Sequence, residues 1–159
     1  MSMSEYQDII TTDIITATVD TFWENDRLSV PEGAEKAVLI LSNSYFAGSP
    51  EETQLNKMLQ ACGLDNEKYN IIQLADNENI AWHKLKYKFK SKYIFLIGLL
   101  PAQLGIAAVF NIHAPNRFDD TIWIPSLSIA ELEKNPEMKK QLWLNALKPV
   151  FVDKSFGNI

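Results

Sequence analysis

Three short apolar runs divide the chain and limit the folds that it can adopt. They are rich in β-branched and aromatic residues and cover residues 36–43, 69–74 and 93–98. Continuous apolar runs of this length are typical of strands buried on both faces, as in parallel sheets covered by helices. Helical patterns separate them, at residues 50–62 and 81–90. This alternation predicts a mainly parallel sheet with helices on its faces.

The first predicted helix has a recognisable signal at each end. Ser49 suits the N-cap, Pro50 suits the first helical position, and Glu52 completes a capping box three residues after the serine. Gly63 suits the left-handed position that follows a last helical turn. Between these ends, apolar residues recur at the spacing of one helix face: Leu55, Met58, Leu59 and Cys62.

The second helical pattern carries a run of lysines. Its apolar residues Trp82, Leu85 and Phe89 fall on one side of a helix, although alternating apolar residues would also suit a strand. The lysines could contact single-stranded DNA through phosphates, with Trp82 stacking on a base. The alternative is a solvated face over an apolar back. The run occupies alternate positions and sums to +5: Lys84, Lys86, Lys88, Lys90 and Lys92.

The last third of the sequence contains two helix starts close together. A polar turn is predicted at residues 115–117, and residues 121–124 predict a strand. Ser128 and Asn135 are then suitable N-cap residues for successive helices. The second of these helices is predicted to end at Pro149. Its apolar stripe consists of Met138, Leu142, Trp143, Ala146 and Leu147.

Length, charge and cysteine content exclude several classes of protein. The 159 residues fit one domain, expected over residues 31–159, after an N-terminal segment of residues 1–30 that could bind a partner through a short helix and an extended stretch. A net charge of −5 argues against nucleic-acid binding by the whole surface. The single Cys62 can supply neither an internal disulfide nor a cysteine cage for zinc or iron–sulfur, which excludes metal chemistry built on cysteine. We expect no metal site and no cofactor.

The location of the protein is also predicted from its apolar runs. The longest, residues 93–100, is far shorter than the roughly 20 residues that span a bilayer. The first residues include Glu5 and Asp8, where a signal peptide would be basic. We therefore expect a cytoplasmic protein.

From residue 36 onward, the order of these segments resembles the uracil-DNA glycosylase superfamily. Iron–sulfur members of that superfamily carry, near the C-terminus, a strand that leads into His-Pro-Ser, then leucines, Asn-Pro, a lysine and a tryptophan. Residues 55–64 look like the first helix of the family, and residues 93–98 look like its central strand. The resemblance implies a three-layer α/β/α fold with a central, mainly parallel sheet. The matching C-terminal string is Ile124-Pro125-Ser126, Leu127, Leu132, Asn135-Pro136, Lys139 or Lys140, and Trp143.

The resemblance lacks the groups that carry out catalysis. In those glycosylases the motif histidine hydrogen-bonds the departing base, but the corresponding residue here is Ile124, which can donate nothing. The water-positioning carboxylate motif of the first strand is replaced by residues 42–45. The four cluster cysteines are missing as well. We therefore predict no enzyme activity and a degenerate pocket at Asn43, Ile124 and Ser126.

A closer similarity is to the psi subunits of bacterial DNA polymerase III, which are catalytically empty relatives with the same fold. The similar segments are residues 37–43, 49–64, 72–74 and 124–143. Psi subunits dock on the clamp loader by an N-terminal tail and on the chi subunit by their folded body, and chi contacts single-stranded-DNA-binding protein. The resemblance implies an interaction subunit of replication or repair with partners of this kind. Residues 1–13 depart from it, because they contain acids and no lysine or arginine.

Two other interpretations stay open. One is a diverged glycosylase or other base-processing enzyme, in which Asn43 would orient a water and His113, near Asp119 and Asp120, would be a displaced catalytic histidine. Against this, an asparagine after a strand is commonly a turn residue, and a single histidine in a loop is commonly solvated or part of the core. The other is an α/β module that binds an unrelated small ligand.

Overall fold

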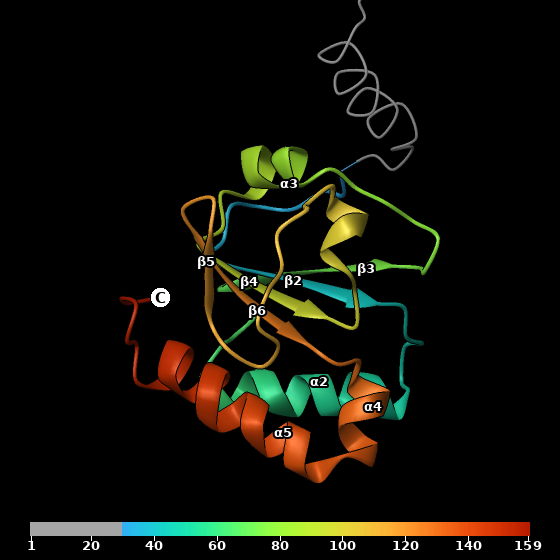
Figure 1. The fold of residues 1–159 in the computed structure, drawn as a ribbon, viewed down its shortest axis with the longest axis vertical. Coiled ribbons are helices and arrows are strands. Elements are labelled where there is room, and N and C mark those ends of the chain that lie inside the picture. Colours follow the sequence, from blue (N-terminus) through green and yellow to red (C-terminus); the bar gives the residue numbers. More distant parts are fainter. Residues whose placement is uncertain (1–29) are drawn as a thin grey trace, which may run out of the picture.

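A computed structural model describes residues 30–159 of the chain. The short helix and extended stretch predicted within residues 1–29, and with them nearly all of the predicted partner-binding segment, lie outside the described residues. The described chain forms an α/β fold around one sheet, with helices above and below it (Figure 1). The predicted fold class, a layered α/β arrangement with a mainly parallel sheet, is confirmed at this level.

The sheet of the described chain has five strands in the order β3-β2-β4-β6-β5. Strands β3, β2, β4 and β6 run parallel to one another, and β5 is antiparallel to β6. All three apolar runs form strands within the predicted ranges. The strand bounds are β2 Val38–Asn43, β3 Tyr69–Leu74, β4 Tyr93–Ile97, β5 Asn116–Phe118 and β6 Thr121–Ser126.

Helices cover both faces of the sheet (Figure 1). The first face packs against α2, α4, α5 and η2, and the second packs against α3 and the short turn η1. Residues 82–89 of the predicted range 81–90 are therefore helical, and the strand alternative is wrong. The helix bounds are α2 Pro50–Ala61, α3 Trp82–Phe89, η1 Pro101–Leu104, α4 Ile129–Lys134, α5 Pro136–Leu142 and η2 Trp143–Val152.

The core lies in two clusters, one on each face, because successive side chains of a strand point to opposite faces. In β6, the neighbours Trp123 and Ile124 are both fully buried, Trp123 on the second face and Ile124 on the first. β4 is buried along its whole length, as a central strand should be. The apolar runs seen in the sequence therefore correspond to strands that fill both clusters.

The start of α2 is capped as predicted. The Glu52 backbone N–H donates to Ser49 Oγ at 3.3 Å. The Glu52 carboxylate accepts from the Gly48 N–H at 2.9 Å, one residue before the position that a standard capping box uses. Gly63, with φ of 75°, follows the last turn. The caps at Ser128 and Asn135 also form, because each side chain accepts a hydrogen bond from the backbone N–H three residues later.

Two local predictions are wrong. Residues 116–118 form strand β5 where a polar turn was expected, and the turn lies at Asp119 and Asp120, with φ of 53° and 61°. Pro149 does not end the last helix, which continues through η2 to Val152 in wider π-type turns. Such turns relax the clash between a proline ring and the preceding carbonyl groups, which is the reason for expecting a stop at proline.

Candidate functional site

The carboxyl edge of the sheet is the first place to look for a site. The chain leaves β2 to form β3 on one side and returns to form β4 on the other side of β2. Ligands of open α/β sheets bind at this switch point, beyond the carboxyl ends of the strands. Asn43 ends β2, Gly98 follows β4, and Ser126 ends β6, so three neighbouring strands deliver these residues to one edge.

Close packing around Gly98 seals this edge. Gly98 has φ of 67°, and its N–H donates to the Ser126 carbonyl at 2.9 Å. A Cβ atom at Gly98 would lie 2.7 Å from Asn43 Oδ1 and 2.9 Å from Ser128 Cβ, closer than real Cβ contacts. The Asn43 amide therefore lies against the backbone of Gly98, directly after the neighbouring strand β4.

A cavity at this edge, beside Asn43, is very small. It has a volume of about 20 Å³, enough for one water molecule. Ligand pockets commonly measure about 300 Å³ or more, so a nucleobase does not fit here. The residues that line it are Ser42, Asn43, Ser44, Tyr45, Glu51, Ile129 and Ala130.

The three residues predicted for a degenerate pocket are only partly brought together. Asn43 lines the small cavity, and Ser126 lies at the end of β6 with its Oγ donating to the Leu127 carbonyl at 2.6 Å. Ile124 has no exposed surface and packs in the first-face core, two residues before the end of its strand. The position that matches the glycosylase histidine therefore faces hydrocarbon and not a pocket.

His113 lies against the end of β6 and the residue that follows it, a contact that the spacing along the sequence did not predict. Its backbone N–H donates to the Pro125 carbonyl at 2.8 Å, and its Nε2 accepts from the Leu127 N–H at 3.4 Å. Only 3% of the residue is exposed, Nδ1 has no partner among the described residues, and burial lowers the pKa of the imidazole. The side chain braces this end of β6 as a neutral acceptor and has almost no surface open to a substrate.

The lysine run lies on α3 and its C-terminal end, and most of it is paired. Lys86 Nζ is 3.0 Å from Asp119, Lys88 is 3.6 Å from Glu32, and Lys90 is 3.1 Å from Glu35. Lys92 lies over the Tyr93 ring at 5.9 Å, and Lys84 is half-buried on the same helix. Contact of these five lysines with DNA stays a prediction, and it would compete with the ion pairs.

Trp82 belongs to the core beneath that helix. It is 6% exposed, meets the Trp123 ring edge-on at a centroid distance of 4.8 Å, and donates its Nε1–H to Asp119 at 2.8 Å. In this structure it presents no open face for stacking on a base. The same hydrogen bond, together with Lys86, lowers the pKa of Asp119.

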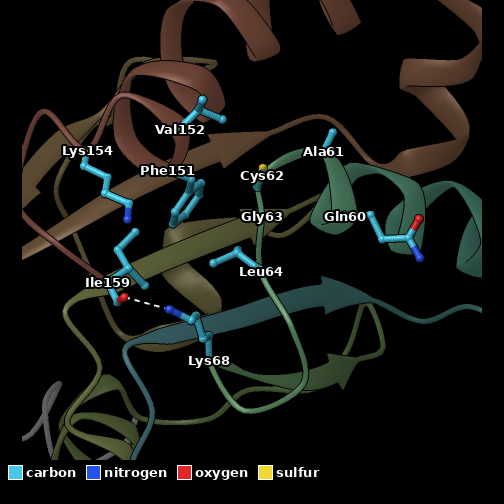
Figure 2. A pocket seen from close by; sticks show the side chains of 10 residues that line it. All are labelled: Gln60, Ala61, Cys62, Gly63, Leu64, Lys68, Phe151, Val152, Lys154 and Ile159. Carbon is cyan, nitrogen blue, oxygen red and sulfur yellow. Dashed lines mark hydrogen bonds between the residues drawn. The ribbon is translucent and has the colours of Figure 1, made fainter.

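A larger pocket opens at the opposite edge, between the end of α2 and η2 (Figure 2). Its volume is about 290 Å³, and on one side Lys68 donates to the Ile159 carbonyl at 2.8 Å. Cys62 on its wall is 3% exposed, and burial raises the pKa of its thiol to about 12, so the thiolate nucleophile is suppressed. Among residues 30–159, no cluster of histidine, cysteine and carboxylate side chains could hold a metal ion.

Comparison of the chain with known protein families and with curated proteins finds no match. In the described part of the chain, none of the helices has the length and apolar character needed to cross a bilayer.

Proposed function

We propose that this chain is a non-catalytic interaction protein with a uracil-DNA-glycosylase-like fold. In this proposal it resembles the psi subunit of bacterial DNA polymerase III and links the clamp loader to the single-stranded-DNA-binding machinery, in replication or repair in the cytoplasm. The mainly parallel sheet, the strand ending in Ile-Pro-Ser and the two capped helices after it support the resemblance. These elements are the ones that the similar sequence segments imply.

One observation carries the non-catalytic part of the proposal. The edge at which a base and a water would have to meet is packed around Gly98, with about 20 Å³ of space beside Asn43. A glycosylase must also flip a base into a fitted pocket and bind DNA phosphates. The described residues have a net charge of zero, and three of the five lysines in the α3 run are paired with acids.

A diverged glycosylase is the second candidate, and His113 is the observation that favours it. Its Nε2 is 3.4 Å from the backbone N–H of Leu127, directly after the Ile-Pro-Ser string. A movement of the loop that carries His113 would bring an imidazole to the sealed edge. Such an enzyme would require Gly98, Asn43 and Ser128 to separate as well.

An activity assay separates the two candidates. The full chain is incubated with single- and double-stranded oligonucleotides that contain uracil, and abasic sites are detected by alkaline cleavage, with an active uracil-DNA glycosylase as positive control. We expect no cleavage above that of a protein-free sample. Robust uracil release would overturn the non-catalytic proposal.

Affinity capture tests the interaction part. The tagged full chain is expressed in its native cell, and the captured proteins are identified by mass spectrometry. We expect components of the clamp loader, a chi-like subunit or single-stranded-DNA-binding protein. Capture of none of them, at an expression level where the tagged chain itself is abundant, would contradict the proposed partners.

A further inference from the structure

Strand β3 forms one edge of the sheet in the described chain, and its own sequence carries none of the residues that commonly protect edge strands. Its sequence, Tyr-Asn-Ile-Ile-Gln-Leu, has six residues and contains no charge and no proline. Natural proteins commonly shield an edge of this length with lysine, proline, a bulge or a covering segment. Among residues 30–159, β2 is the only strand that pairs with β3.

The register shows which backbone groups face outward. The Val38 N–H donates to the Lys68 carbonyl at 3.0 Å, and Val38 is aligned with Tyr69. Backbone groups alternate in direction along a strand, so those of Asn70 and Ile72 face β2, and those of Tyr69, Ile71 and Gln73 face away from it. The Tyr69 carbonyl already accepts from Lys36 at 3.3 Å. Within residues 30–159, the N–H and C=O groups of Ile71 and Gln73 have no backbone partner and are available to another strand.

A polar groove lies at the start of this edge, between α2, the loop of residues 64–66 and Tyr69, the first residue of β3. Its volume is about 380 Å³, and its walls offer amide and phenol groups from Asn56, Gln60, Asn66 and Tyr69 above the apolar Leu59 and Leu64. Asp65 is the one charged lining residue, and its Oδ1 accepts from the Glu67 N–H at 3.0 Å. Amide groups both donate and accept hydrogen bonds, so this lining suits an uncharged polar side chain.

We propose that β3 and this groove bind an extended segment of a partner protein as an added strand. The backbone of that segment would pair with Ile71 and Gln73, and an Asn, Gln, Ser or Thr side chain would enter the groove. Main-chain pairing gives affinity in such complexes, and pockets for alternate side chains give specificity. The inference deepens the proposed interaction function, on which it rests, by naming a surface and the chemistry of its partner.

A partner segment fits this surface better than a second copy of the chain does. Two copies paired through β3 by a two-fold axis perpendicular to the sheet would place both α2 helices on the same face, beside the same groove. A single added strand has no helix of its own and leaves the groove walls open to its side chains. The open groove therefore favours a single partner strand over a second copy of the chain.

The test selects ligands from a displayed library of random twelve-residue peptides, with the full chain as target. A selected peptide is synthesised, and its affinity is measured by fluorescence anisotropy. We expect Asn56→Trp, which fills the groove from α2, to weaken binding at least tenfold. Thr53→Trp is the matched control, because Thr53 is exposed on the same helix and does not line the groove; it should change the affinity less than twofold.

Amide hydrogen exchange supplies the second measurement. We expect the peptide to slow exchange at Ile71 and Gln73 at least tenfold and to leave Asn70 and Ile72 nearly unchanged. The proposal is overturned if no peptide is selected, or if Asn56→Trp and Thr53→Trp bind alike. It is also overturned if the Ile71 amide is already protected from exchange in the free protein. Sedimentation would then show whether a second copy of the chain or other residues of the same chain cover the edge. Uracil release with intact peptide binding would instead remove the proposed function and leave this site standing.

Discussion

The two faces of the sheet are covered in different ways (Figure 1). In the described chain, the first face is covered by four helical segments, α2, α4, α5 and η2. The second face has one short helix, the turn η1 and the chain between residues 106 and 118. Aromatic rings fill the space on that second face, where Phe110 stacks on Trp123 at 5.4 Å and Phe118 meets it at 6.1 Å. Large rings there bury the area that helices bury on the other face.

The two faces also differ in how well local sequence patterns predict them. Helices carry caps and a regular spacing of apolar residues, so the first face can be predicted locally. Aromatic contacts on the second face join residues far apart in the chain, such as Trp82 and Trp123, and no local pattern announces them. In β6, Trp123 packs on the second face and its neighbour Ile124 packs on the first. Substitutions at these two positions therefore compare the stability that each face contributes.

We expect Trp123→Ala to have the largest effect, because the Trp123 ring contacts the rings of Trp82, Phe110 and Phe118 on the second face. Removing a fully buried tryptophan costs about 3–5 kcal/mol of unfolding free energy, and it also leaves the Thr121 hydroxyl without the indole donor 2.8 Å away. Urea denaturation followed by circular dichroism measures the loss. Tyr87→Ala, at an aromatic residue that is 83% exposed on α3, is the control and should cost less than about 0.5 kcal/mol. Equal losses would show that the rings do not support this face.

Ile124→His tests the helical face at the adjacent position. The imidazole would enter hydrocarbon without a hydrogen-bond partner, at a cost of about 3 kcal/mol. Ile124→Val, the control, should cost about 1 kcal/mol. Denaturation curves measure both, and the uracil assay should stay blank for the histidine variant because Asn43 and Gly98 still seal the edge. Uracil release by this single variant would mean that the edge opens.

The same comparison accounts for what the sequence could and could not predict. Strands β2, β3, β4 and β6, helix α2 and the caps at Ser49 and Ser128 follow from local patterns, and each forms. The hairpin turn at Asp119 was missed because two aspartates are not a usual pair for positive φ, and the turn is held by Trp82 and Lys86 from a distant helix.

The candidate site was less predictable than the fold. Ile124 and Ser126 were assigned to a degenerate pocket by their match to the family motif, but only the strand geometry shows that Ile124 is inside the core. The closure of the edge depends on Gly98 meeting Asn43 from a neighbouring strand, and His113 reaches the residue after β6 across fourteen residues of chain. These are tertiary contacts, and spacing along the sequence carries no signal for them.

Gly98→Ala tests how tightly the residues at the carboxyl edge of the sheet are packed around Gly98. A side chain at positive φ costs about 1–2 kcal/mol, and crowding against Asn43 and Ser128 adds to this, so we expect a loss of about 2–3 kcal/mol. Gly63→Ala is a matched control, since Gly63 has a similar φ of 75° and nothing within 4 Å of its Cβ position. Urea denaturation gives both values. If the two variants lose the same amount, the neighbours of Gly98 move apart easily and the seal is weak.

Acid should weaken the contact of the His113 side chain with the Leu127 backbone, which follows β6. The pKa of His113 is lowered by burial, so below about pH 6.5 the unfolded chain binds a proton that the folded chain resists. The contribution of this residue to stability is therefore fully present above pH 6.5 and is lost as the pH falls, by no more than about 1.4 kcal/mol per pH unit. Urea curves at pH 7.5, 6.5 and 5.5 should show a steeper loss for the native sequence than for His113→Gln.

The smallest effect is expected at the turn of the β5–β6 hairpin, which ties the aromatic face to α3. Asp119 and Asp120 both have positive φ, but only Asp119 contacts Trp82 and Lys86. Replacing Asp120 by glycine relieves the strain of the left-handed conformation, which exceeds the entropy cost of glycine, so we expect a gain of about 0.5 kcal/mol. Asp119→Gly gains the same relief and loses both contacts, and it should be neutral or destabilising. Thermal denaturation of the two variants compares them directly. An equal gain for both would mean that the Trp82 and Lys86 contacts contribute nothing, and that the rings alone hold the second face together.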